Sequence, residues 1–156
     1  MALEQGGQIP DLALTASDGG SLRLREFLGQ PLVVYFYPKD DTPGCTKQAQ
    51  DFSAHQADFA ALGVKLLGIS KDTPAKHRKF IEKYALSVPL ASDDDNAVLE
   101  AFGAWVEKSM YGKSYMGIDR STFLFDKNGT LVRVWRKVKV PGHVADVLAA
   151  ARALTE

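Results

Sequence analysis

The chain has 156 residues, 46% of them hydrophobic and 24% charged, which is typical of a folded protein and predicts one domain over residues 1–156. Nineteen basic residues balance nineteen acidic ones, so no net charge favours nucleic acid or an anionic membrane as a partner. The longest apolar stretch, residues 31–38, is too short to cross a bilayer, and the first residues lack the pattern of a signal peptide. We therefore expect a cytoplasmic protein.

The first predicted elements are a β segment around residues 12–24 and a buried central strand at residues 32–37, a continuous β-branched and aromatic run. After a loop at residues 39–44, apolar residues recur at helical spacing as far as Gly63, a stop signal. Residues 64–69 then read as a second buried strand. The two strands should be parallel, because a helix connects them.

The second half of the chain begins with a helix that Thr73 can cap and in which Pro74 suits the first turn. A shorter helix is expected to begin in the acidic run 93–95, whose carboxylates favour a helix N-terminus, and to end at Gly103. The remaining signals predict a hairpin of two strands joined by a tight turn, and then a final helix. Their positions are 121–125 and 131–135 for the strands, Asn128-Gly129 for the turn, and about 142–154 for the helix.

This order of elements predicts an α/β protein of thioredoxin-like fold, with a central mixed β-sheet flanked by helices and an N-terminal β extension. The aromatic and methionine-rich segment 102–116 is expected to contribute to the core, with an apolar collar around a pocket or a dimer face as alternatives. The side chains concerned are Phe102, Trp105, Met110, Tyr111, Tyr115 and Met116.

The only cysteine, Cys45, falls at the carboxyl end of the first buried strand and at the start of the following helix. Open α/β sheets bind ligands at that position, and the unpaired amides and dipole of a helix N-terminus favour a reactive thiolate. Gly44 would let a ligand or backbone approach the sulfur closely. An inert cysteine buried as a small apolar residue is the alternative.

Two carboxylates close to this cysteine, Asp40 and Asp41, would disfavour a thiolate. We expect them to point to solvent or to pair with Lys39 or Lys47. A single cysteine excludes an internal disulfide and a cysteine-rich metal site, and the three histidines show no ligand spacing, so we expect neither a metal nor a cofactor.

Other cysteine chemistries fit the sequence less well. A thioredoxin-type reductase would need a second cysteine where Thr42 stands. A cysteine hydrolase would need a base, yet His55 lies ten residues along the same helix, His77 is explained by a helix face, and His143 by a first turn. A peroxidase needs neither partner.

Residues 37–46, Tyr-Pro-Lys-Asp-Asp-Thr-Pro-Gly-Cys-Thr, resemble the active-site segment of the peroxiredoxins, most closely that of the bacterioferritin comigratory protein (PrxQ) subfamily. The family pattern Pro-x-x-x-Thr-x-x-Cys falls on Pro38, Thr42 and Cys45. A second segment, residues 108–125, resembles the stretch that carries the family's arginine, here Arg120.

The resemblance implies that Cys45 is the peroxidatic nucleophile and that Thr42 offers its hydroxyl to the peroxide. Arg120 would stabilise the thiolate and the charge on the leaving oxygen, and Pro38 would shield the sulfur from water. Gln48 would fix the arginine or the loop. Each residue taken singly could instead be an ordinary turn or surface residue.

Many members of this subfamily carry a second cysteine, either five residues after the nucleophile or in the next helix. Gln50 and Ile81 occupy these places here. The resemblance therefore implies a one-cysteine peroxidase that reduces hydrogen peroxide and organic hydroperoxides to water and alcohols through a sulfenic acid. An external thiol, from thioredoxin or from glutathione with glutaredoxin, would regenerate Cys45.

Relatives of this kind act in antioxidant defence, and by analogy we expect a monomer or a weak homodimer. The main alternative function is a redox sensor that signals to a partner through Cys45 oxidation. A holdase-type chaperone and a cysteine hydrolase are weaker alternatives.

Overall fold

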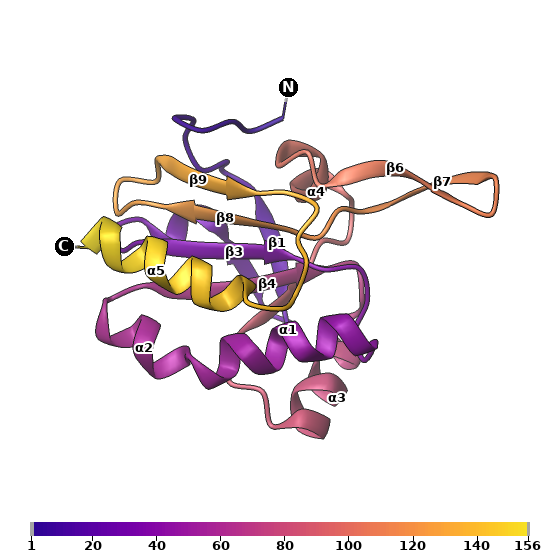
Figure 1. Cartoon of the computed structure of the whole chain (residues 1–156), viewed down its shortest axis with the longest axis horizontal. Helices are drawn as coiled ribbons and strands as arrows, with labels where there is room; N and C mark the ends of the chain where they lie inside the picture. The colour runs from indigo at the N-terminus through magenta and orange to yellow at the C-terminus, as the bar shows by residue number, and fades with distance from the viewer. Residues whose placement is uncertain (1, 156) are drawn as a thin grey trace.

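The computed structural model describes residues 2–155 and contains a seven-stranded mixed sheet in the order β2-β1-β5-β4-β3-β8-β9 (Figure 1). Strands β3, β4 and β5 are parallel neighbours, and β8 pairs antiparallel with β3. The expected thioredoxin-like fold is thus confirmed. The sheet strands are β1 (Ala13–Ala16), β2 (Ser21–Arg23), β3 (Leu32–Phe36), β4 (Lys65–Ser70), β5 (Leu90–Ser92), β8 (Ser121–Phe125) and β9 (Leu131–Trp135); the helices are η1 (Leu24–Phe27), α1 (Pro43–Ala54), α2 (Gln56–Ala61), α3 (Pro74–Tyr84), α4 (Ala97–Ala101) and α5 (His143–Thr155).

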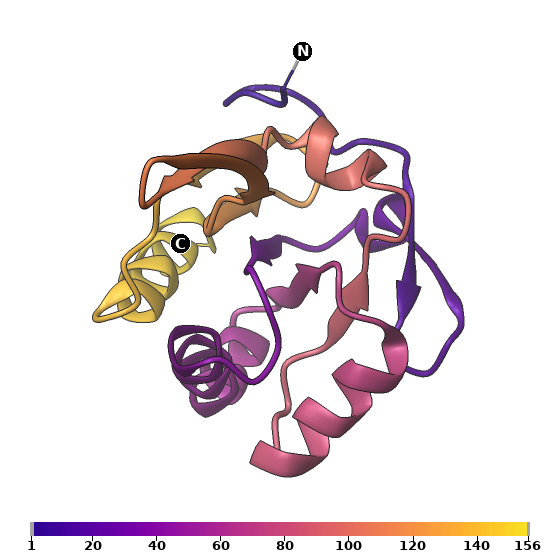
Figure 2. The same ribbon diagram turned by 90° about the vertical axis from the view of Figure 1, so that its right-hand side faces the viewer.

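Every residue of the central strand β3 is buried, because helices cover both faces of the sheet. Val33 and Tyr35 face a core formed with α1, α2, α3 and α5. Leu32, Val34 and Phe36 face a second core formed with α4 and η1. Figure 2 shows the two layers of helices on opposite sides of the strands. This double coverage explains why the strand reads as an uninterrupted apolar run.

The helix expected to run to Gly63 is interrupted at His55, so that α1 ends at Ala54 and α2 begins at Gln56. The imidazole Nδ1 of His55 lies 3.0 Å from the carbonyl oxygen of Asp51. The side chain thus competes for a carbonyl oxygen that normally accepts only from a backbone N–H of the helix. The acidic run 93–95 also lies outside its helix, and an Asp93 carboxylate oxygen accepts from the amide of Leu99. Helix propensities alone predict neither the break at His55 nor the start of α4 at Ala97.

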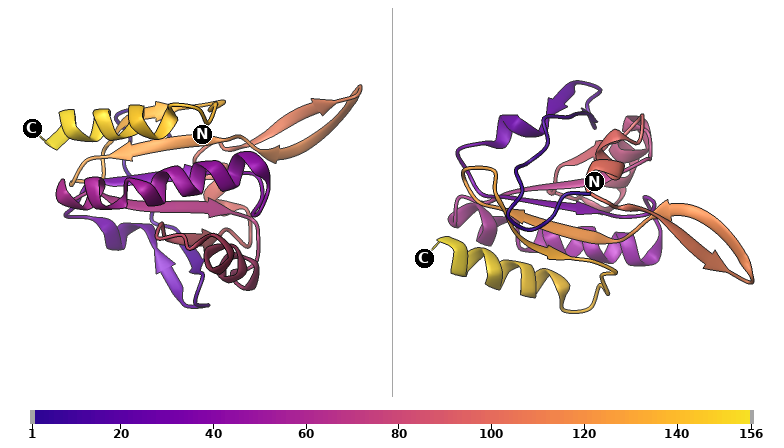
Figure 3. Two further views of the ribbon diagram at one scale, coloured as in Figure 1. Left: turned by 60° about the horizontal axis from the view of Figure 1, so that its bottom comes forward. Right: turned by 90° about the horizontal axis from the view of Figure 1, so that it is seen from above.

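The expectation that segment 102–116 belongs to the core is wrong for most of it. Residues 105–118 form a separate hairpin, β6 (Trp105–Met110) and β7 (Lys113–Ile118), that projects from the body of the molecule (Figure 3). Its turn residues Tyr111 and Gly112 have φ angles of 52° and 78°, which suit a tight hairpin turn. Phe102 is buried and Trp105 partly buried, whereas four side chains are exposed: Met110, Tyr111, Tyr115 and Met116.

No helix within residues 2–155 is long and apolar enough to span a membrane.

His143, the first residue of α5, gives the fold a pH dependence that can be measured. Burial lowers the pKa of His143 from 6.5 to about 4, and its Nε2 lies 2.8 Å from the hydroxyl of Thr122. Between these two pH values the unfolded chain holds a proton that the folded chain lacks. We expect the free energy of unfolding to fall as the pH decreases from 6.5 to 4, by up to about 1.4 kcal/mol per pH unit.

Urea unfolding at several pH values tests this expectation. His143→Gln keeps a polar group beside Thr122 and removes the titration, so the variant should show a flatter dependence on pH. An equal slope in both proteins would contradict the assignment.

Candidate active site

The candidate site lies where the strand order of the sheet brings two distant segments together. Strand β3 ends at Phe36, and the loop that follows it leads into α1. Because Phe36 pairs with Ser121 of the antiparallel strand β8, Arg120 lies beside the carboxyl end of β3. Figure 1 shows the starts of α1 and β8 at the same end of the sheet, the end from which the β6–β7 hairpin projects.

Cys45 lies in the first turn of α1 and is only 1% exposed. Its Sγ accepts a hydrogen bond from Nη2 of Arg120 at 3.2 Å. The first turn of α1 contains no acidic residue, so the helix dipole and the guanidinium both favour negative charge on the sulfur. The sulfur therefore lies between a guanidinium and the N-terminal end of a helix.

Gln48 lies one helical turn after Cys45 and holds the arginine in place. Its Oε1 accepts from Nη1 of Arg120 at 2.6 Å, while Nη2 of the same guanidinium reaches the sulfur. Gln48 is fully buried, and its Nε2 has no hydrogen-bond partner among residues 2–155. The hydrogen bond to Arg120 is therefore the polar contact that compensates for burying the Gln48 side chain.

Thr42 is the N-cap residue of α1, but its side chain does not cap the helix. Its hydroxyl donates instead to the carbonyl oxygen of Lys39 at 2.8 Å. Because that bond uses the only hydroxyl proton, the Thr42 oxygen can act only as an acceptor toward a bound molecule.

The two acidic residues of the loop have partners that the sequence did not predict. Asp41 accepts from Lys83 and Tyr84 of α3, and these hydrogen bonds hold the pKa of its carboxyl below the usual value. Asp40 is buried against Tyr37 and His77. The expected pairing with Lys39 or Lys47 is wrong, because Lys47 binds Asp51 within α1. Both loop carboxylates therefore form hydrogen bonds with residues of the loop or of α3, and neither pairs with Lys47.

Pro38 and Gly44 complete the set of residues singled out in the sequence. Pro38 is exposed and directly follows the buried Tyr37. A Cβ atom added to Gly44 would lie 3.2 Å from Nη2 and 3.8 Å from Cζ of Arg120. Gly44 thus leaves room for the guanidinium next to the sulfur.

Gly44→Ala is expected to slow the reaction of Cys45 with hydrogen peroxide about tenfold, because the added methyl group displaces the guanidinium. Stability should not fall, since alanine favours a helix over glycine by up to about 1 kcal/mol. Stopped-flow kinetics and thermal unfolding of the same preparation measure both quantities. Gln50→Ala, at an exposed position of α1, is the matched control, and a wild-type rate in Gly44→Ala would contradict the steric argument.

Within residues 2–155, no group of three or more His, Cys, Asp and Glu side chains could hold a metal ion.

Comparison with known proteins identifies the family. The AhpC/TSA family profile matches residues 5–134. Peroxiredoxin Bcp of Bacillus subtilis (strain 168) is 46% identical over 156 residues, which cover 100% of this chain and 99% of the relative.

Solved structures agree with this result. Bacterioferritin comigratory protein of Xanthomonas campestris, studied for alkyl peroxide reduction, superposes with a TM-score of 0.92 at 44% identity, covering 98% of this chain and 100% of that one. A cysteine-to-serine mutant of PrxQ from Xylella fastidiosa gives a TM-score of 0.94 at 35% identity, covering 100% and 99%. The chain therefore belongs to the AhpC/TSA family, is similar throughout to peroxiredoxins of the Bcp and PrxQ type, and is a thiol-dependent peroxidase with a single cysteine.

Proposed function

We propose that Cys45 reduces hydrogen peroxide and organic hydroperoxides through a sulfenic acid and is regenerated by a thiol from outside the chain. The observation that carries this proposal is the 3.2 Å hydrogen bond from Arg120 to the Cys45 sulfur at the start of α1. Organic hydroperoxides are included because the Xanthomonas campestris relative is described by its alkyl peroxide reduction activity.

In the first step the Cys45 thiolate attacks one oxygen of the hydroperoxide, and the O–O bond breaks. A sulfur–oxygen bond forms, and the proton of the attacked oxygen passes to the leaving oxygen, which departs as water or an alcohol. Cys45 is left as a sulfenate, which takes a proton from solvent to become the sulfenic acid. Thr42 accepts a hydrogen bond from the peroxide proton, since its own proton is bound to Lys39. Arg120 stabilises the negative charge that moves from the sulfur to the leaving oxygen.

The supporting residues act on this first step. Gln48 fixes the rotation of the guanidinium through its bond to Nη1, Gly44 provides space for it, and Pro38 shields the sulfur side of the loop from water. Exclusion of water strengthens the electrostatic contribution of Arg120.

The second step needs a reductant, because the chain contains one cysteine and Gln50 and Ile81 carry no thiol. An external thiol condenses with the sulfenic acid to form a mixed disulfide and water. A second thiol then attacks this disulfide, so that a disulfide of the reductant leaves and Cys45 is restored. Either thioredoxin or glutathione with glutaredoxin can supply these thiols.

Steady-state turnover with each reductant tests the full cycle. We expect peroxide consumption coupled to NADPH in one of two reconstituted systems, thioredoxin with its reductase or glutathione with glutaredoxin and glutathione reductase. Cys45→Ser should abolish turnover in both. Rapid oxidation of Cys45 without turnover in either system would instead favour a redox sensor.

A further inference from the structure

A buried histidine–aspartate pair lies beneath the loop that precedes Cys45. His77 of α3 is fully buried, and its Nδ1 lies 2.7 Å from a carboxylate oxygen of Asp40, which is 8% exposed. The other ring nitrogen, Nε2, lies 3.1 Å from the carbonyl oxygen of Ala91 in β5. The pair thus connects the loop to a helix and to the sheet, and no step of the proposed reaction has used it.

The hydrogen bonds determine how the pair carries its protons. A carbonyl oxygen can only accept, so Nε2 of His77 carries a proton and donates to Ala91. The Tyr37 hydroxyl donates to the second oxygen of Asp40 at 2.6 Å, and burial raises the pKa of Tyr37 well above its ordinary value, so it keeps its proton. One proton remains between Nδ1 and the carboxylate. Every polar atom of the pair therefore has a hydrogen-bond partner.

The peptide group between Lys39 and Asp40 links this pair to Thr42. Its carbonyl oxygen accepts the Thr42 hydroxyl at 2.8 Å. Its N–H donates at 2.8 Å to Asp72, whose same carboxylate oxygen also accepts from the Ser70 hydroxyl. Asp72 therefore holds the N–H of the peptide group whose carbonyl oxygen orients the Thr42 hydroxyl. The buried side chain of Asp40 anchors the residue to which this N–H belongs.

We propose that Asp40 and His77 act as one unit that positions Thr42, and through the loop Cys45, for the reaction with peroxide. They are positioning residues, because neither touches the sulfur. The inference rests on the proposed function of Thr42 as an acceptor for the peroxide proton. It explains why a histidine and an aspartate are buried together when a peroxidase has no need of a histidine base.

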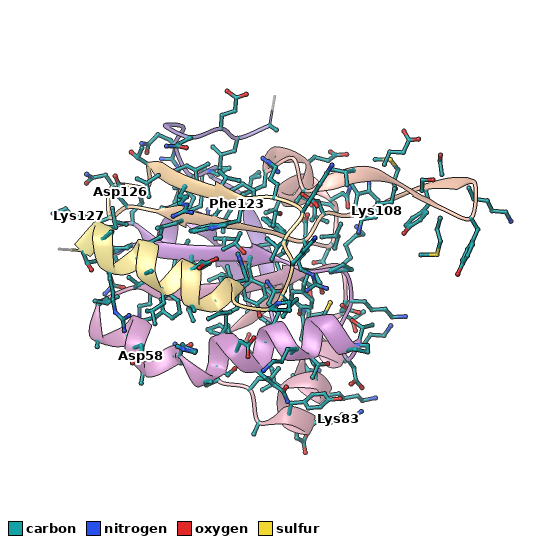
Figure 4. All side chains as sticks on the ribbon, viewed as in Figure 1. Asp58, Lys83, Lys108, Phe123, Asp126 and Lys127 are labelled. Carbon is teal, nitrogen blue, oxygen red and sulfur yellow. The ribbon has the colours of Figure 1, made fainter. Side chains whose placement is uncertain are left out.

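A second contact between α3 and the loop provides an internal comparison. Asp41 adopts a left-handed conformation, with φ of 58°, and is bound by Lys83 at 2.8 Å and by Tyr84 at 2.6 Å. Asp41 and Lys83 are both exposed (Figure 4 labels Lys83 on α3). Exposed ion pairs contribute little, so the buried Asp40–His77 pair should dominate the positioning of the loop.

A double-mutant cycle tests whether the two residues act as a unit. Asp40→Ala and His77→Leu should each slow the oxidation of Cys45 by hydrogen peroxide about tenfold or more, since small displacements of reacting groups have effects of this size. The double variant should be no slower than the slower single variant. Effects that multiply in the double variant would overturn the proposal.

Asp40→Asn separates positioning from charge. Its amide can donate to Nδ1 of a neutral His77, and its oxygen can still accept from Tyr37, so the variant should recover most of the rate that Asp40→Ala loses. A rate as low as that of Asp40→Ala would overturn the positioning role. If His77→Leu fails to fold, His77→Gln replaces it in the cycle.

Two controls complete the experiment. Lys83→Ala removes the exposed contact and should change the rate less than about threefold. Val98→Ala, in the opposite core, lowers stability without touching the loop and should leave the rate unchanged. A slow Val98→Ala variant would show that stability alone limits the reaction, and would overturn the proposal.

Hydrogen exchange of the loop amides gives a readout that does not depend on peroxidase activity. Exchange at residues 38–46 should rise about tenfold or more in Asp40→Ala and His77→Leu, and less in Asp40→Asn. If the wild-type protein reacts slowly with peroxide, the proposed function fails, while this exchange pattern still decides whether the pair holds the loop. Unchanged exchange in both variants would overturn the inference.

Discussion

Replacing Arg120 with alanine is expected to slow the oxidation of Cys45 by hydrogen peroxide about 100- to 1000-fold, the range for losing one preorganised donor at a developing charge. The effect is large because a single guanidinium does two things. Its Nη2 donates to the sulfur at 3.2 Å, and in the proposed reaction the same group stabilises the negative charge that develops on the leaving oxygen. Stopped-flow kinetics with one equivalent of peroxide measures the rate constant directly.

Three variants make this prediction specific. Arg120→Lys keeps the charge but offers one nitrogen in place of the two that contact Gln48 and Cys45, so its rate should fall between those of wild type and Arg120→Ala. Gln48→Ala should also be slowed, because it frees the guanidinium to rotate. Arg133→Ala, an exposed arginine over the Trp135 ring, should react like wild type. A rate within about threefold of wild type in Arg120→Ala would contradict its role in transition-state stabilisation.

Thr42→Val is expected to have the second-largest effect, a loss of about 100-fold in the same rate constant. Valine has nearly the shape of threonine but cannot accept a hydrogen bond from the peroxide. It also removes the 2.8 Å hydrogen bond to the Lys39 carbonyl oxygen, so the loop loses one of the hydrogen bonds that hold its conformation.

Thr42→Ser keeps the hydroxyl and should retain most of the rate. Thr46→Val, one helical turn further along α1, makes the same chemical change at a position outside the proposed contacts and should react normally. A wild-type rate in Thr42→Val, or a loss in Thr42→Ser as large as that in Thr42→Val, would contradict the role given to the hydroxyl.

Much of the fold could be predicted from local sequence signals. The run at residues 32–37 corresponds to β3 because a strand buried on both faces needs apolar residues at every position. Asn128-Gly129 correctly placed the β8–β9 hairpin, in which Gly129 has a φ of 81°. Thr73 caps α3 by accepting from the amide of Lys76.

Local sequence signals predict only part of the candidate site. Periodicity placed Cys45 at a helix N-terminus, as the structure has it. Arg120 was singled out only by the family resemblance, because its nearness to the sulfur depends on the pairing of β3 with β8. No local pattern encodes which strand lies next to β3.

The features that the sequence does not predict depend on contacts between residues that are distant in the sequence. Asp40 and His77 looked like a loop residue and a helix-face residue, and only the packing of α3 against the loop joins them. The β6–β7 hairpin contains aromatic and methionine residues that resemble core residues, yet within residues 2–155 its strands pair only with each other. Its turn, Tyr111-Gly112, lacks the asparagine or aspartate that usually signals a tight hairpin.

The most direct test of the account is the reaction of reduced wild-type protein with one equivalent of hydrogen peroxide at pH 7, followed by stopped-flow fluorescence and by intact mass. We expect addition of one oxygen atom at Cys45, with a rate constant at least about 1000-fold above that of free cysteine, because Arg120 and the helix N-terminus lie at the sulfur and favour the transition state. A rate no faster than that of free cysteine, or oxidation at a residue other than Cys45, would contradict it.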